Sequence, residues 1–256
     1  MEVARAAGQP GGASDALQDN TLSEEITAAM RAVAQRRFGE AMAPAVVEAW
    51  QAFSAAFREF PFDGSVVYNA PMQYGPSNLL WAEPTRFHAT MVGFPYDDLD
   101  GWRGPYPPDI FISQFEKVAD GFAAATTALR ASFNGLRAEL KPAHAENMAG
   151  ELNVAEAAAI HFRSTANQAR FVRARQTLAG QKSGPSSQKL VAELEAVVRS
   201  ELDLARRLHA IQSRDSRIGF EATNHYYYVP LDLAEKVLNC RELLDGWLAR
   251  ERLAAQ

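Results

Sequence analysis

The sequence predicts an all-α protein, an antiparallel bundle of about five long helices with one irregular insert rich in aromatic residues and proline. Apolar residues recur every three or four positions over long stretches, which is typical of helices that pack on a core. Eight of the 13 prolines fall within residues 61–108, so helix-breaking residues are confined mainly to one segment. The chain has 256 residues, 47% of them hydrophobic and 22% charged, which suits a folded globular domain.

Residues 1–21 are rich in glycine, alanine and serine, and we predict a disordered lead without the apolar core of a signal peptide. Residues 22–256 are predicted to form a single helical domain. Its first helix should begin near Ser23, whose hydroxyl can cap the helix, and end at Gly39. The second should begin near Pro44 and end before Pro61, with an apolar stripe at Val46, Trp50, Phe53, Phe57 and Phe60.

The insert, residues 61–108, contains too many prolines and glycines for a long helix. It also carries many large apolar and aromatic side chains, so we expect an ordered, irregular segment that packs on the helices. Short extended pieces are expected at residues 65–68 and 87–92.

Three long helices and a shorter last one should follow the insert. The first begins at residues 107–109 and reaches about residue 140, and the second begins at Pro142 with an alanine-lined stripe that lets its neighbour approach closely. A turn at residues 180–185 precedes the next, which carries Val191 and Leu208. After a polar and aromatic junction at residues 214–230, the last helix should run from about residue 231 to about 253.

Composition excludes several classes of function. The net charge of −5 gives no general attraction to nucleic acid or to an anionic membrane. No stretch approaches the roughly 20 apolar residues of a membrane span. The single cysteine, Cys240, excludes an intrachain disulfide and a cysteine-based metal site, and its place in an apolar stripe predicts a buried thiol. We expect a cytoplasmic protein with no cofactor and no metal.

The first candidate site lies in the insert, where aromatic rings alternate with charged groups. Sugar binding needs flat aromatic faces against C–H surfaces, and carboxylate or guanidinium groups for hydroxyls. Tyr96, Asp97, Asp98, Trp102 and Arg103 offer this mixture on a loop. The structural alternative is that one aspartate caps a turn while Arg103 pairs with one of the two.

The second candidate site is the junction, where Glu221, Asn224 and His225 precede three consecutive tyrosines. His225 can act as an acid or base near neutral pH, with Glu221 as a carboxylate partner. The structural alternative is that the tyrosines pack a helix junction. Because buried polar groups need partners, we predict that the bundle brings insert and junction together at one end. The residues expected to lie close together are Asp97, Asp98 or Trp102 of the insert and Glu221, Asn224 or His225 of the junction.

These two segments also carry a resemblance. PTRFHATMVGFPYDDLDGWRGPYPPDIF and DSRIGFEATNHYYYVPLDLAEKVLNC resemble the C-terminal regions of large bacterial glycoside-hydrolase-like proteins, which carry a hexosaminidase-like (β/α)-barrel before a helical region. The resemblance runs from about Leu22 to about Leu248. A barrel needs alternating strands and helices over about 250 residues, which this chain lacks. The resemblance therefore implies the accessory helical part without the barrel, and no catalytic residue carries over.

The predicted function is that of a helical accessory module that binds or frames a sugar, with a carbohydrate or a catalytic barrel domain as its partner. One alternative is a complete glycoside hydrolase that uses Asp97, Asp98 and Glu221, which requires carboxyl groups roughly 5–10 Å apart across an open cleft. The other is a structural bundle that binds another protein through an exposed apolar patch.

Overall fold

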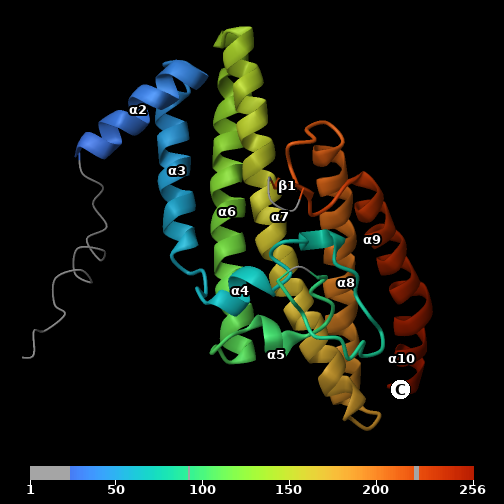
Figure 1. Ribbon diagram of the computed structural model, residues 1–256. Coiled ribbons are helices and arrows are strands. Elements are labelled where there is room, and N and C mark those ends of the chain that lie inside the picture. Colours follow the sequence, from blue (N-terminus) through green and yellow to red (C-terminus); the bar gives the residue numbers. More distant parts are fainter. Residues whose placement is uncertain (1–23, 92, 222–224) are drawn as a thin grey trace, which may run out of the picture.

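The computed structural model describes residues 24–91, 93–221 and 225–256, and its architecture is mostly α-helical (Figure 1). The larger helices are α2 (Glu24–Phe38), α3 (Ala43–Phe57), α6 (Pro108–Leu136), α7 (Pro142–Ala179), α8 (Pro185–Gln212), α9 (Pro230–Glu242) and α10 (Leu248–Ala254). The shorter pieces are α4 (Gly64–Tyr68), η1 (Gly75–Ser77), α5 (Leu99–Trp102), η2 (Arg137–Glu139), the π-helical turn η3 (Leu243–Trp247), and the strands β1 (Phe220–Glu221) and β2 (His225–Tyr226). The predicted all-α class is confirmed.

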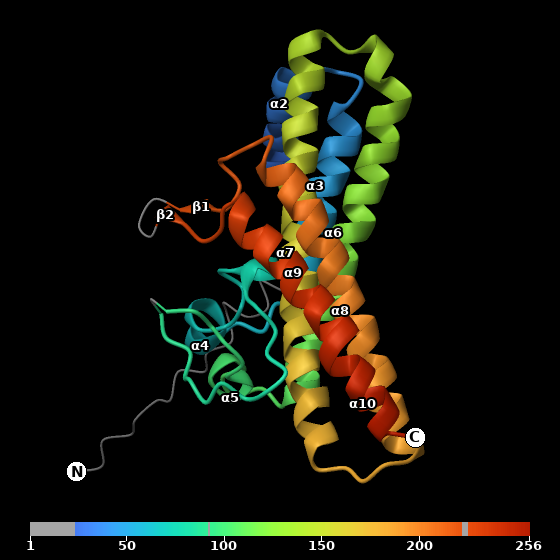
Figure 2. The same ribbon diagram turned by 90° about the vertical axis from the view of Figure 1, so that its right-hand side faces the viewer.

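Helices α6, α7 and α8 follow one another along the chain and form the central body of the molecule (Figures 1 and 2). Their short connections make each helix antiparallel to the one before it. Helix α3 packs on α6, and α9 packs on α8, so α7 lies at the centre. The finer prediction, a single antiparallel bundle of about five long helices, is not confirmed by this arrangement.

Proline marks the start of most of the larger helices. The sequence predicts this for α6 and α7, whereas it assigns Pro185 and Pro230 to the turn and the junction that precede the next helices. Pro108, Pro142, Pro185 and Pro230 each stand in the first turn of α6, α7, α8 and α9. Proline fits there because the first backbone N–H groups of a helix have no partner within the helix. Gly39, directly after α2, has a φ of 89°, a left-handed conformation that ends a helix at little cost for glycine.

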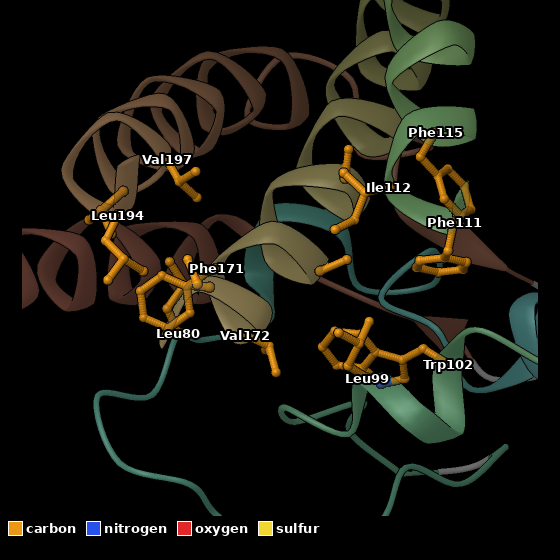
Figure 3. Packing of buried hydrophobic residues seen from close by; sticks show 14 of the residues in the cluster. Leu80, Leu99, Trp102, Phe111, Ile112, Phe115, Phe171, Val172, Leu194 and Val197 are labelled. Atoms are coloured by element: carbon orange, nitrogen blue, oxygen red, sulfur yellow. The ribbon is translucent and has the colours of Figure 1, made fainter. Parts of the chain in front are cut away.

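The insert packs some of its large apolar side chains onto the long helices. Leu80, Leu99 and Trp102 lie in one cluster with Phe111 of α6 and Phe171 of α7 (Figure 3). The Trp102 side chain is fully buried, so the insert supplies part of the core and is not an appendage.

The prediction of an extended piece at residues 65–68 is wrong, because these residues belong to helix α4. Asp63 caps this helix by accepting a hydrogen bond from the Ser65 backbone N–H at 2.9 Å. The expected piece at residues 87–92 forms no strand over residues 87–91, and residue 92 lies outside the described chain. The only strand pairing in the described residues joins β1 to β2 antiparallel, with Glu221 opposite His225.

Candidate functional site

A row of polar side chains on helix α7 faces the insert and fixes its backbone. The row consists of His161, Ser164, Thr165, Gln168 and Arg175, whose spacing places them on one side of the helix. His161 Nδ1 lies 3.2 Å from the Met72 carbonyl oxygen, and Gln168 donates to the Gly75 carbonyl at 2.8 Å. Arg175 donates to the Trp81 carbonyl at 2.5 Å. Helix α7 thereby holds the insert at three points along its length.

Arg175 also forms a buried ion pair with Asp97. The Arg175 Nη2 to Asp97 Oδ2 distance is 2.8 Å, and the two side chains are 4% and 6% exposed. The Thr85 backbone N–H donates to the same carboxylate at 3.1 Å, and the Thr85 hydroxyl donates to its other oxygen. Burial alone would raise the pKa of Asp97, but hydrogen bonds from Thr85 and Arg175 outweigh it and lower that pKa. Asp97 is therefore a charged residue of the interior.

A second buried polar network joins the insert to helices α7, α8 and α9. Glu201 of α8 and Lys236 of α9 form an ion pair of 3.1 Å in which both side chains are fully buried. Ser164 and Asn167 of α7 each donate to the Glu201 carboxylate at 2.9 Å. Lys236 donates to the Asn78 carbonyl, so the pair also supports the insert backbone.

A pocket of about 390 Å³ lies beside this network, between the insert and the start of helix α9. Its wall contains five aromatic residues, from the insert and the junction, together with Ser77, Asn78 and Leu79. Two acids of α9 complete it. The aromatic residues are Tyr74, Trp81, Phe94, Tyr96 and Tyr227, and the acids are Asp232 and Glu235.

The aromatic rings of the pocket touch one another in series. Tyr74 stacks on Phe94 with ring centroids 4.8 Å apart, and its edge meets the Tyr227 ring at 5.9 Å. Phe94 also lies 6.2 Å from Tyr96. Phe94 is 54% exposed and Trp81 is 37% exposed, so both present ring surface to solvent. This series provides flat apolar faces at the mouth of the pocket.

Tyr96 has a left-handed backbone conformation, with a φ of 49°, which is uncommon for a bulky side chain. Its neighbours hold this conformation. Asn78 donates to the Tyr96 carbonyl at 2.9 Å, and the next residue, Asp97, is paired with Arg175. Tyr96 lines the pocket in this strained conformation, and strained backbone conformations are common at binding sites.

The electrostatics of the pocket are acidic. Its charged lining residues are Asp232 and Glu235, three residues apart on α9. Burial raises the pKa of Tyr74, and the neighbouring Tyr227 and Tyr96 raise it further, so its phenol keeps its proton. The pocket therefore offers hydroxyl groups, aromatic faces and carboxylates to a ligand.

The five site residues predicted in the insert have different environments. Tyr96 lines the pocket, while Asp97 is buried against Arg175. Asp98 caps helix α5 by accepting from the Gly101 N–H at 3.2 Å, and it also accepts from the Ala89 N–H at 3.0 Å. Trp102 is fully buried and donates to a backbone carbonyl, and Arg103 pairs with Asp100 at 2.8 Å. Only Tyr96 of these five belongs to the pocket wall.

The predicted residues of the junction are only partly described. Glu221 and His225 are opposite one another in the β1–β2 pair, and Asn224 lies outside the described residues. Insert and junction do meet, but through Tyr74 and Tyr227, which are not among the residues predicted to lie together. They meet along the side of helix α7 and not at an end of the bundle (Figure 2).

His161 of helix α7 also connects the insert to the junction, because it contacts a residue of each. Its Nε2 lies 2.8 Å from the Tyr228 hydroxyl, while its Nδ1 faces the Met72 carbonyl. These partners fix the neutral ring, since Nδ1 donates and Nε2 accepts. Burial lowers the pKa of His161 to about 4, so the ring is uncharged at neutral pH.

Sequence reasoning missed most of the pocket residues. Tyr74 and Phe94 lie within the predicted insert but were not among its predicted site residues. Asp232 and Glu235 look like ordinary acids in the first turns of a helix. The available signal was the polar row on α7, because polar side chains at helical spacing on a buried helix indicate contact with another polar segment.

Across the residues that the structure describes, no group of three or more histidine, cysteine, aspartate or glutamate side chains could hold a metal ion. Within the same ranges, no helix combines the length and apolar character needed to cross a membrane.

Comparisons with protein-family models, curated proteins and solved structures found no match to this chain. The resemblance to the helical regions of glycoside-hydrolase-like proteins therefore stays a prediction that rests on the two segments quoted above.

Proposed function

We propose that this chain binds a carbohydrate ring in the aromatic pocket between the insert and helix α9. The observation that carries the proposal is the series of touching rings beside two carboxylates. Aromatic faces suit the C–H surfaces of a pyranose. Carboxylates accept hydrogen bonds from its hydroxyls, and phenol hydroxyls can donate to them or accept from them. A volume of about 390 Å³ falls within the roughly 300–1,000 Å³ of small-ligand sites.

The polar network beneath the pocket supports rigid presentation of these rings. The Asn78 amide donates both to the Tyr96 carbonyl and to Gln168, at 2.9 and 2.6 Å. Ser77 donates to the Tyr74 carbonyl at 2.7 Å. A site whose side chains are fixed before binding loses less conformational entropy when the ligand arrives.

Binding without hydrolysis is the second part of the proposal. Glycoside hydrolysis needs two carboxyl groups that flank the scissile bond. Asp232 and Glu235 are three residues apart on one helix, so both approach a ligand from the same side. Asp97 is engaged with Arg175, and Asp98 caps a helix, which argues against the complete-hydrolase alternative.

The resemblance seen in the sequence supports a proposal about the larger enzyme to which this module would belong. We propose an accessory module of a carbohydrate-active enzyme, in which the antiparallel helices support the site and a catalytic barrel is the partner. A cytoplasmic location is part of this proposal, and a single cysteine, which cannot form an intrachain disulfide, fits a reducing compartment.

A second candidate function is binding to another protein through exposed apolar side chains of the insert, of which Phe94 also lines the pocket. Phe87, Met91 and Phe94 are 63%, 57% and 54% exposed, which is unusual for three large apolar side chains so close in sequence. These exposed side chains would bind a protein whether or not the pocket holds a sugar.

Titration of the purified protein with neutral and amino oligosaccharides tests the proposal, by calorimetry and by tryptophan fluorescence. Trp81 lines the pocket, whereas Trp102 is fully buried, so a bound sugar should change the Trp81 emission. Phe94→Ala should weaken binding about tenfold or more because it removes a stacking face. Phe62→Ala is the matched control, since Phe62 is 78% exposed and does not line the pocket. No binding by any oligosaccharide, or equal losses in both variants, would contradict the proposal in favour of the protein-binding candidate.

A further inference from the structure

The carboxylates of the pocket have no counter-ion among the residues that the structure describes. Glu235 forms no ion pair and no side-chain hydrogen bond there. Asp232 accepts one hydrogen bond, from the Val229 backbone N–H to Oδ2 at 2.9 Å, which leaves Oδ1 available. The pocket therefore presents uncompensated negative charge to whatever enters it.

The basic residue next to Glu235 in sequence does not neutralise it. The Lys236 side chain is fully buried, and its ammonium group is paired with Glu201 and bonded to the Asn78 carbonyl. Lys236 points into the protein while Glu235 lines the pocket, as adjacent helix positions require. A ligand must supply any positive charge that balances the two acids.

The aromatic wall adds to the same preference. The face of an aromatic ring is the negative pole of its quadrupole, so a cation above it is attracted. Five such residues line one pocket, together with two acids and, within the described chain, no lysine or arginine. An anionic ligand would be repelled by this wall, while a protonated amine would contact both ring faces and carboxylate oxygens.

We propose that the pocket selects a protonated amine carried on a sugar ring, so that its ligand class is a cationic amino sugar. This inference rests on the proposed carbohydrate binding, because the ring faces contact the sugar while the acids contact its ammonium group. N-acetylation of the same sugar removes the charge and should remove the preference.

Four probes separate the possibilities in titrations of the full chain: a glucosamine trisaccharide, its N-acetylated counterpart, a glucose trisaccharide and choline. We expect the glucosamine trisaccharide to bind at least tenfold tighter than the two neutral trisaccharides. This advantage should shrink as ionic strength rises, because salt screens exposed charges.

Two charge-neutralising variants on helix α9 provide the matched comparison. Glu235→Gln should reduce the ratio of glucosamine-trisaccharide affinity to neutral-trisaccharide affinity about tenfold, because glutamine keeps an oxygen for the sugar hydroxyls but carries no charge. Glu242→Gln makes the same charge change seven residues later, outside the pocket lining, and should have little effect on any probe.

The outcomes separate this inference from the proposed function. Equal affinity for charged and neutral trisaccharides would overturn the amine preference and leave carbohydrate binding in place. Choline binding as tightly as the amino sugar would overturn the role of the sugar ring, and with it the proposed function. No binding by any probe would overturn both.

Discussion

Lys236→Met removes a fully buried ammonium group while keeping an unbranched side chain that fills much of the same space. Glu201 keeps the hydrogen bonds from Ser164 and Asn167, each 2.9 Å long, but it loses the cation 3.1 Å away. Leaving one charge of a buried pair uncompensated costs about 3–5 kcal/mol, a large part of the roughly 5–15 kcal/mol stability of a typical domain. In a chain of this size, such a loss lowers Tm by about 6–20 °C.

Urea unfolding followed by circular dichroism measures this loss, and a double-mutant cycle isolates the pair. Glu201→Gln keeps the hydrogen-bonding shape but leaves Lys236 uncompensated, so it should destabilise by a similar amount. The double variant removes both charges and should lose less than the sum of the single variants. Arg207→Met is the control, since its ion pair with Glu156 is 3.2 Å long but 47% exposed at the arginine and should contribute less than about 1 kcal/mol. A loss below about 1 kcal/mol in Lys236→Met would show that water compensates the buried charge and would refute the argument.

Three further predictions concern buried groups. Trp102→Ala should destabilise the fold by about 3–5 kcal/mol in urea unfolding, because the side chain is fully buried. The Trp102→Ala protein that remains folded should not show the tenfold loss of ligand affinity that is expected for Phe94→Ala. Stability should fall as pH decreases from 6.5 to 4, by up to about 3 kcal/mol, because the unfolded chain binds a proton at His161 that the folded chain, with a pKa of about 4, excludes. His161→Gln should reduce this pH dependence, and an unchanged difference between pH 7 and pH 4.5 would contradict the assignment. Cys240 should react with iodoacetamide only after unfolding, because burial raises the pKa of its thiol to about 12, and rapid labelling of the native protein at pH 8 would contradict its burial.

The sequence alone determined the helices, because their causes are local. The spacing of apolar residues predicts a buried helix face, and the prolines predict where α6 and α7 begin. The density of prolines in residues 61–108 predicts an irregular insert for the same reason, since proline removes a backbone donor wherever it stands. Asp63 shows the limit of this reasoning, because a single capping side chain turned an expected extended piece into helix α4.

The site could not be assigned in this way, because its residues come together only in the folded chain. Asp97 and Trp102 are residue types that are typical of a sugar site. Asp97 is nevertheless buried, because Arg175, 78 positions away in the sequence, pairs with it in the interior. Only its helical spacing from Gln168 distinguishes Arg175 from Arg170 and Arg173, which are partly exposed and pair with acids of α6. Trp102 likewise turns inward because the insert packs on α6 and α7.

Tertiary packing alone decided which aromatic side chains stayed accessible. The wall of the pocket combines Tyr74, Trp81 and Phe94 of the insert with Tyr227 of the junction and the acids of α9, and more than 150 positions separate Tyr74 from Tyr227. Periodicity specifies which face of each helix is buried, but it carries no information about which distant segment covers that face. That choice depends on the hydrogen bonds that Asn78, Gln168, Glu201 and Lys236 satisfy together, and these exist only when all their helices are in place.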